Sequence, residues 1–118
     1  MPREMTHWLV LEAALRRLGG GYAGFLERRG EIRSALLLGA VLHDAPYYHR
    51  LGRSEFVKVG NYLHGHADRD TLDPVRKLMS ADSSHDRNLI EAIAIGMISH
   101  IATDVAFHPF IFYFTGDY

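Results

Sequence analysis

The stretch that decides the fold is Gly96-Met-Ile-Ser-His100-Ile-Ala-Thr-Asp104-Val-Ala-Phe-His108-Pro109. Its ionisable side chains, His100, Asp104 and His108, are spaced at i, i+4 and i+8. Because successive residues of an α-helix are rotated by about 100°, these side chains form one stripe along a helix. Histidine and aspartate are residue types that bind metal ions. The sequence therefore predicts a helix that presents three potential metal ligands on one side.

The residues around this stripe predict that the helix is buried on most sides. Aliphatic residues, alanine and glycine dominate from Leu89 to Phe107. The run is long enough for a membrane span, but Glu91, His100 and Asp104 lie within it and would be costly in lipid. We therefore expect a buried helix of a soluble protein without a transmembrane segment, in which metal coordination satisfies the buried polar groups.

The end of this helix has two interpretations. The residue before a proline is disfavoured in helical conformation, so Pro109 predicts that His108 lies at or just past the last turn. In the non-metal alternative, Asp104 and His100 form an ordinary buried hydrogen-bonded pair, and His108 interacts favourably with the helix dipole.

Composition limits the class of protein. The 118 residues predict a single domain, residues 1–118. With 13 Lys and Arg against 14 Asp and Glu, the net charge gives no indication of binding to nucleic acid or an anionic membrane. With no cysteine, any metal must be bound by His, Asp or Glu. The N-terminus lacks the apolar core of a signal peptide, so we expect a cytoplasmic protein. Eight histidines are dispersed at positions 7, 43, 49, 64, 66, 85, 100 and 108.

The remaining sequence predicts further helices and no clear strand, which indicates an all-α multi-helix bundle. The start of the final helix is assigned to a cap at Ser83 or Ser84. Phe110 to Phe114 remains ambiguous between helix and strand. The other expected helices are His7–Leu18, Tyr22–Arg29, Glu31–His43, Ser54–Leu63 and one that begins at Thr71–Pro74.

Three further stretches carry candidate ligands. His7 lies on the apolar side of the first helix and is expected to point inward; the alternative is a histidine that caps the helix by bonding to backbone. Asp44 follows a buried helix, whose negative end disfavours a lone carboxylate, so a bound cation would stabilise it. The alternative for Asp44 is an ordinary turn residue ahead of Pro46. The third stretch is His64-Gly-His66.

The last residues, Ile111 to Tyr118, include an aromatic run that we expect to need burial. We therefore expect either more chain after Tyr118, so that these residues are the N-terminal part of a longer domain, or a partner subunit, as in a homo-oligomer.

Four stretches together resemble the zinc-dependent phospholipase C family: Thr6-His7-Trp8, Gly39 to Pro46, Leu63 to Thr71 and Gly96 to Pro109. That family includes bacterial phosphatidylcholine-cleaving enzymes, the animal phospholipase D that acts on glycosylphosphatidylinositol anchors and, more distantly, fungal single-strand nucleases. The resemblance implies a helical bundle with one to three zinc ions. It also implies phosphodiester hydrolysis by a metal-activated water, with a phospholipid or another phosphodiester as substrate.

The resemblance also implies a role for each candidate residue. Asp104 would bridge two zinc ions, with His100 beside it. Asp44 and His64 would bind the same metal, with His66 in reserve for His64, and Asp44 would also be the general base. His7 would bind the third zinc, and His108 would begin the second site.

Two other readings remain open. The His43-Asp44 doublet is similar to that of HD-domain phosphohydrolases, with His7 and Asp104 as its partners. We prefer the phospholipase family because an HD site does not explain His100 together with His108. The family also needs an HxxxE pair downstream of His108, and residues 109–118 contain neither His nor Glu. An inactive or truncated relative that serves as a structural or binding module is therefore the third hypothesis.

Overall fold

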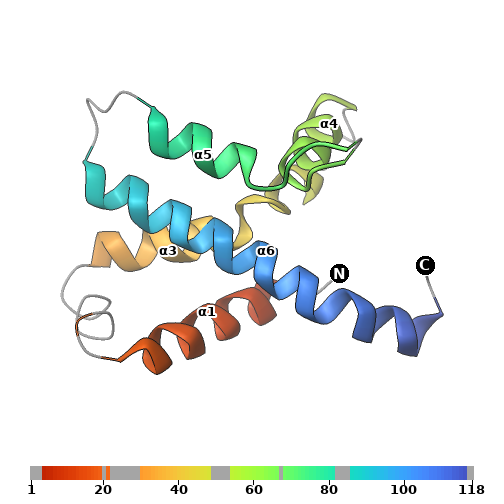
Figure 1. The fold of residues 1–118 in the computed structure, drawn as a ribbon, viewed down its shortest axis with the longest axis horizontal. Coiled ribbons are helices and arrows are strands. Elements are labelled where there is room, and N and C mark those ends of the chain that lie inside the picture. Colours follow the sequence, from red (N-terminus) through yellow and green to blue (C-terminus); the bar gives the residue numbers. More distant parts are fainter. Residues whose placement is uncertain are drawn as a thin grey trace.

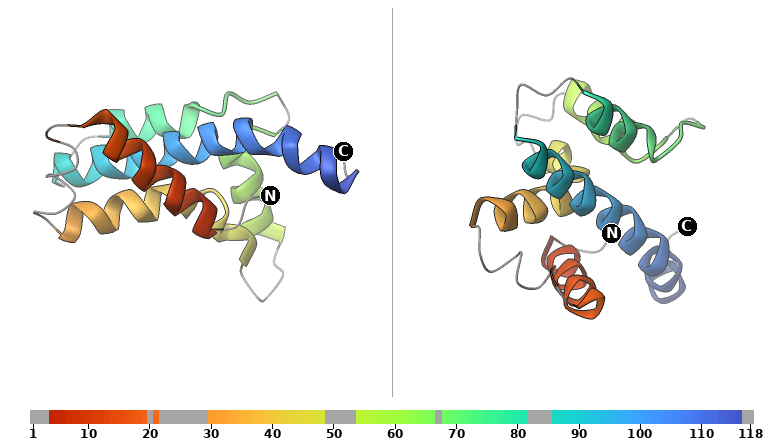
Figure 2. Two further views of the ribbon diagram at one scale, coloured as in Figure 1. Left: turned by 90° about the horizontal axis from the view of Figure 1, so that it is seen from below. Right: turned by 60° about the vertical axis from the view of Figure 1, so that its left-hand side comes forward.

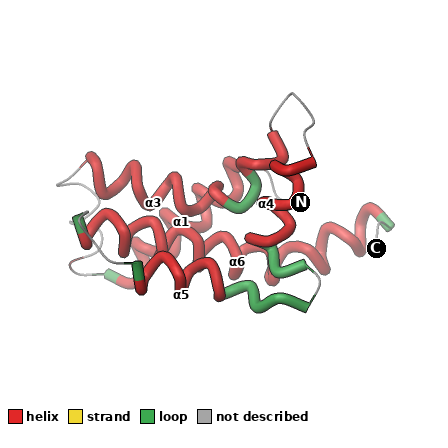
Figure 3. Tube along the Cα trace, turned by 90° about the horizontal axis from the view of Figure 1, so that it is seen from above, coloured by secondary structure: helices red, strands yellow, loops and turns green. Residues whose placement is uncertain are grey.

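A computed structural model describes residues 4–19, 21, 30–48, 54–66, 68–81 and 86–116. These residues form helices and turns with no strand among them, which confirms the predicted all-α class (Figure 3). The predicted helix at 22–29 lies outside the described residues. In chain order the elements are α1 (Glu4–Leu18), α3 (Gly30–Leu42), the short 3-10 helix η1 (Ala45–Tyr48), α4 (Ser54–Leu63), α5 (Asp73–Ser80) and α6 (Arg87–Thr115).

The long helix α6 is the centre of the fold. It runs across the molecule and packs most extensively against α3, with α1 and α5 as further neighbours (Figures 1 and 2). One apolar core fills the space between α1, α3 and α6 and includes Leu11, Leu15, Ile32, Leu36 and Ala92; a second core joins α5 to α6 through Val75, Ala94 and Met97.

The helices α3 and α6 cross at two glycines, and their backbones are in contact there. A methyl group on Gly96 would lie 2.3 Å from the Leu36 carbonyl oxygen, and one on Gly39 would lie 2.2 Å from the Ile93 carbonyl oxygen. Only glycine permits this approach. The crossing brings the end of α3 against the middle of α6, where His100 lies.

Two predicted boundaries of α6 are wrong. The helix begins after Asp86, whose side chain accepts a hydrogen bond from the Asn88 N–H, so the predicted cap at Ser83 or Ser84, which lie outside the described residues, does not start it. Pro109 does not end the helix, which continues to Thr115 and stops at Gly116 in left-handed conformation. Pro109 has no backbone N–H, so it cannot make the helical hydrogen bond to the carbonyl oxygen of Val105. Because Val105 is exposed, water can reach that carbonyl, and the helix can continue.

The C-terminal part of α6 is largely exposed. The ambiguous Phe110–Phe114 run is helical, and it extends past the other described helices (Figures 1 and 2). Phe110, Tyr113 and Phe114 are 60 to 77% exposed. By length and composition α6 could cross a membrane, but the central helix of a soluble bundle meets the same criteria. A partner or segment that covers this end remains a prediction.

Candidate metal centre

His100 is fixed by a hydrogen bond to the end of α3. Its Nδ1 lies 2.7 Å from the Ala40 carbonyl oxygen, to which it donates. That carbonyl belongs to the last turn of α3, where carbonyls have no partner within a continuing helix; the N–H of Asp44 bonds to Val41 instead. Because Nδ1 carries the proton, Nε2 of His100 presents a lone pair on its other side.

His64 has the same arrangement on another element. It follows α4, and its Nδ1 lies 2.8 Å from the Gly60 carbonyl oxygen. The Tyr47 ring packs against Gly60, where a methyl group would lie 2.6 Å from it, and its hydroxyl donates to Asn61 at 2.8 Å. Metal-binding histidines commonly donate their second ring N–H to a carbonyl, which fixes the tautomer and the ring orientation. His64 therefore also presents Nε2 as an acceptor.

Asp104 lies between two pairs of imidazoles. Its Oδ2 is 3.1 Å from Nε2 of His100 and 3.7 Å from Nε2 of His64. Its Oδ1 is 3.5 Å from Nε2 of His7 and 3.4 Å from Nε2 of His108. One carboxylate thus faces a different pair of histidines with each oxygen, which is the geometry that a bridging ligand requires.

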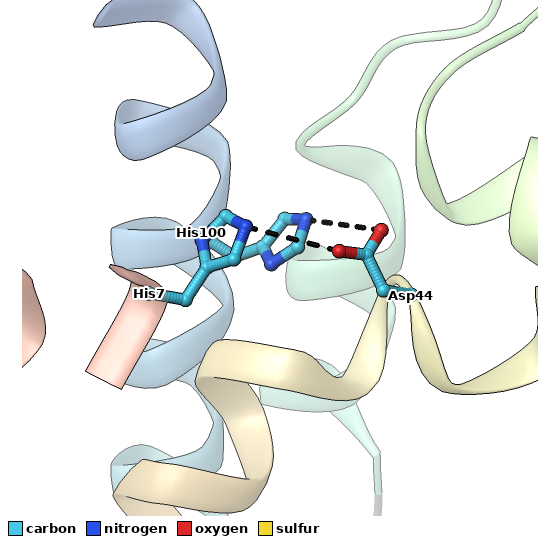
Figure 4. Close-up of side chains that lie close together, drawn as sticks. All are labelled: His7, Asp44 and His100. Carbon is cyan, nitrogen blue, oxygen red and sulfur yellow. Dashed lines mark ion pairs between the residues drawn. The ribbon is translucent and has the colours of Figure 1, made fainter. Parts of the chain in front are cut away.

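Asp44 divides its oxygens in the same way. Its Oδ1 is 3.1 Å from Nε2 of His64 and 3.7 Å from Nε2 of His100, and its Oδ2 is 3.8 Å from Nε2 of His7. Figure 4 shows His7 and His100 side by side, with both rings directed at the Asp44 carboxylate. The structure therefore brings all six predicted ligands together, from α1, the turn after α3, the turn after α4, and α6: His7, Asp44, His64, His100, Asp104 and His108.

The polar atoms at this centre are buried and lack hydrogen-bond partners. His7, Asp44 and His100 are at most 1% exposed. Within the described part of the chain, Nε2 of each of the four ligand histidines and Oδ1 of both aspartates have no hydrogen bond. Such atoms are costly to bury unless something binds them.

The charges at the centre also favour a bound cation. Among the described residues, the ion-pair partners of Asp44 and Asp104 are histidines, with no lysine or arginine to neutralise two buried carboxylates. There are two groups of three residues whose ligand atoms all lie within 4.8 Å of one another. One group is His7, Asp44 and His100, and the other is His64, His100 and Asp104. Nitrogen and carboxylate donors at this spacing, without thiolates, fit a divalent zinc ion.

The pKa shifts favour the neutral ring at His7 and His43 and the charged ring at His64. Burial and the neighbouring His100 lower the pKa of His7. Burial lowers the pKa of His43 to about 3. At His64 burial opposes the charged ring, but the Asp44 carboxylate and the Gly60 carbonyl outweigh it and raise the pKa. Burial also favours the neutral acid of Asp104, yet the adjacent His100 lowers its pKa. Neutral imidazoles and ionised carboxylates are the forms that bind metal.

A cavity of about 390 Å³ reaches the centre from one side. Among the described residues that line it, Asp104 is the only carboxylate; Asp44 is not one of them and is 1% exposed. His66 also lines the cavity and is exposed, with its ring 6.4 Å from that of His64. The other lining residues are His43, His64, Thr71, His100, Ile101, Val105, His108 and Pro109.

The sequence did not predict that His43 packs against the ligand histidines. The sequence places it beside Asp44, which suggested only a metal-binding doublet. Its ring instead stacks on His100 and is fully buried, and neither group of ligand atoms within 4.8 Å includes it. No pattern in the sequence could reveal a stack between residues 57 positions apart.

A family model described as zinc dependent phospholipase C matches residues 6–117. No curated protein and no solved structure matches the chain. The family match covers the helices that supply His7, Asp44, His64 and the ligand stripe of α6, and it favours the phospholipase reading over the HD-domain alternative.

Proposed function

This chain belongs to the zinc-dependent phospholipase C family, and we propose that it is a zinc-dependent phosphodiester hydrolase. The observation that carries the proposal is the division of the carboxylate oxygens at the centre. Asp104 directs one oxygen at His64 and His100 and the other at His7 and His108. A single buried ion pair would not need this arrangement, whereas two adjacent cations would.

The more complete of the two positions has four ligands. His64 and His100 supply Nε2 atoms whose rings are held by backbone carbonyls. Asp44 supplies Oδ1 and Asp104 supplies Oδ2. Four nitrogen and oxygen donors are the usual number for zinc. We propose that this position binds zinc most tightly.

The second position is formed by the other side of the same carboxylates. His7 and His108 approach Asp104 Oδ1, and His7 also approaches Asp44 Oδ2. His108 is more exposed than the other ligands and lines the cavity. We propose that a second zinc binds here, more weakly and next to the substrate.

Bound zinc would supply Lewis acidity toward a phosphoryl oxygen and would lower the pKa of a water molecule. The substrate would bind in the cavity, whose lining includes His66 and Thr71. The general base implied for Asp44 is a proposal too. Its carboxylate is 1% exposed and faces three imidazoles, so it could accept a proton only from a water molecule bound within the metal centre. Asp104, which lines the cavity, is the alternative base.

The test is hydrolysis by protein that has been stripped of metal and then titrated with zinc. The substrates are bis(p-nitrophenyl) phosphate and a short-chain phosphatidylcholine, which separate general phosphodiester chemistry from phospholipid cleavage. We expect hydrolysis to appear with zinc and to fall by about 100-fold or more in Asp104→Asn. The matched control is Glu91→Gln, which makes the same change at an exposed position of α6 and should retain activity.

If the wild-type chain binds zinc but cleaves neither substrate, the proposed hydrolase activity is wrong, and a metal-binding structural module accounts for the centre instead.

A further inference from the structure

His43 is a buried imidazole that the proposed zinc positions leave unused. It lies in the turn between α3 and η1, is 0% exposed, and has no hydrogen bond from either ring nitrogen within the described part of the chain. Burying an unpaired polar ring is unfavourable. Its placement therefore calls for a role other than hydrogen bonding by its ring nitrogens.

The ring geometry shows what His43 touches. Its ring is parallel to that of His100, with centroids 4.6 Å apart and an interplanar angle of 8°. His7 is also parallel to His100, at 3.9 Å and 11°. Two parallel rings this close cannot share one face of His100 without overlapping each other. His100 therefore lies between His7 and His43.

This stack restricts a motion that the hydrogen bond alone allows. The bond from Nδ1 of His100 to Ala40 fixes one atom of the ring, but the ring plane can still tilt about that bond. Flat groups on both faces prevent the tilt and hold Nε2 in the direction of Asp104. His43 also meets the ring of His64 edge to face, with centroids 5.5 Å apart, so one side chain touches both imidazoles of the tighter zinc position.

From these contacts we propose that His43 is a positioning residue, whose flat ring holds His100 and His64 in the orientation that binds zinc. The proposal rests on the proposed function, because it concerns the same centre. The ring acts through its shape and its face, and its nitrogens do not bind the metal. Residues that orient metal ligands commonly change metal affinity by 10- to 100-fold when they are removed.

The test compares zinc affinity in three proteins by competition with a chelator of known affinity. His43→Ala removes the ring, and we expect zinc binding to weaken by about 10-fold or more. His43→Phe keeps a flat ring without nitrogens, and its affinity should stay within about threefold of wild type. The absorption spectrum of the cobalt-substituted protein provides a second readout: the bands should shift in His43→Ala and stay in place in His43→Phe.

Two results would overturn the proposal. Equal loss in His43→Phe and His43→Ala would mean that a ring nitrogen binds the metal, and an unchanged His43→Ala would mean that the stack is dispensable. If His43→Ala does not fold, as judged by melting of the zinc-free protein, His43→Leu replaces it, since leucine fills space without a flat face. A wild-type chain that binds no zinc would refute the proposed function itself, whereas three proteins with equal affinity would refute only the role of His43.

Discussion

At the scale of single residues, the centre is organised by which imidazole nitrogen carries the proton. His64 and His100 donate from Nδ1 to the carbonyls of Gly60 and Ala40, so both leave Nε2 free to face the aspartates. The sequence offered His64 and His66 as equivalent candidates. The structure separates them, because Nε2 of His64 lies 3.1 Å from Asp44 whereas His66 is exposed.

A pair of neighbouring substitutions tests this separation. We expect His64→Ala to weaken zinc binding by about 100-fold or more, because it removes one of four ligands. His66→Ala should change zinc affinity by less than about threefold, since His66 is exposed and outside the ligand group. Isothermal titration of zinc into both variants measures the difference. A larger loss in His66→Ala would contradict the assignment.

The low pKa of His43 predicts how the zinc-free protein responds to acid. Below pH 6.5 the unfolded chain binds a proton at His43, while the folded chain does not bind it until about pH 3. The free energy of unfolding should therefore fall with decreasing pH, by about 2 kcal/mol from this ring between pH 7.5 and pH 5. The lowered pKa of His7 acts in the same direction, and the raised pKa of His64 acts in the opposite one.

Urea unfolding of zinc-free wild type and His43→Phe, at pH 7.5 and pH 5, isolates this contribution, because the other histidines are common to both proteins. The wild type should lose about 2 kcal/mol more than the variant. Equal losses would show that His43 is protonated in the folded protein at pH 5.

At the scale of elements, the crossing of α3 and α6 positions the ligands. Gly39 and Gly96 allow the two backbones to touch, and the Ala40 carbonyl then reaches His100 from the last turn of α3. Helix periodicity correctly placed His100, Asp104 and His108 on one stripe. It could not show that glycines set the distance to the opposite helix, because that depends on packing between residues far apart in the sequence.

Substitution of Gly96 tests this crossing. In Gly96→Ala the new methyl group would meet the Leu36 carbonyl and the Ala40 N–H, which are backbone atoms that cannot rotate away. We expect a loss of about 1–3 kcal/mol in stability, together with weaker zinc binding as Ala40 moves from His100. Gly30→Ala is the matched control, since a methyl group there meets nothing within 4 Å. Equal stability and zinc affinity in both variants would contradict this role for the crossing.

At the scale of the whole molecule, the fold class and the stripe of His100, Asp104 and His108 were predictable, because apolar periodicity and the spacing of His and Asp are local signals. That His7, Asp44 and His64 join this stripe was implied only by the resemblance to the family, since they lie far from it in the sequence. What failed depended on context. Pro109 predicted a helix end, but α6 continues to Thr115. The aromatic residues around Tyr113 are exposed, so the further chain or partner subunit expected to cover them stays a prediction. The stack of His43 on His100 likewise arises only when the helices pack.

The most direct measurement is the zinc content of the purified chain, by mass spectrometry after weakly bound ions are removed and zinc is added back. The centre predicts at least one tightly bound zinc per chain, at His64, His100, Asp44 and Asp104, and its loss in Asp104→Asn but not in Glu91→Gln. Zinc binding should also raise the melting temperature, because the metal binds only the folded chain. No retained zinc and no stabilisation by added zinc would contradict the central claim.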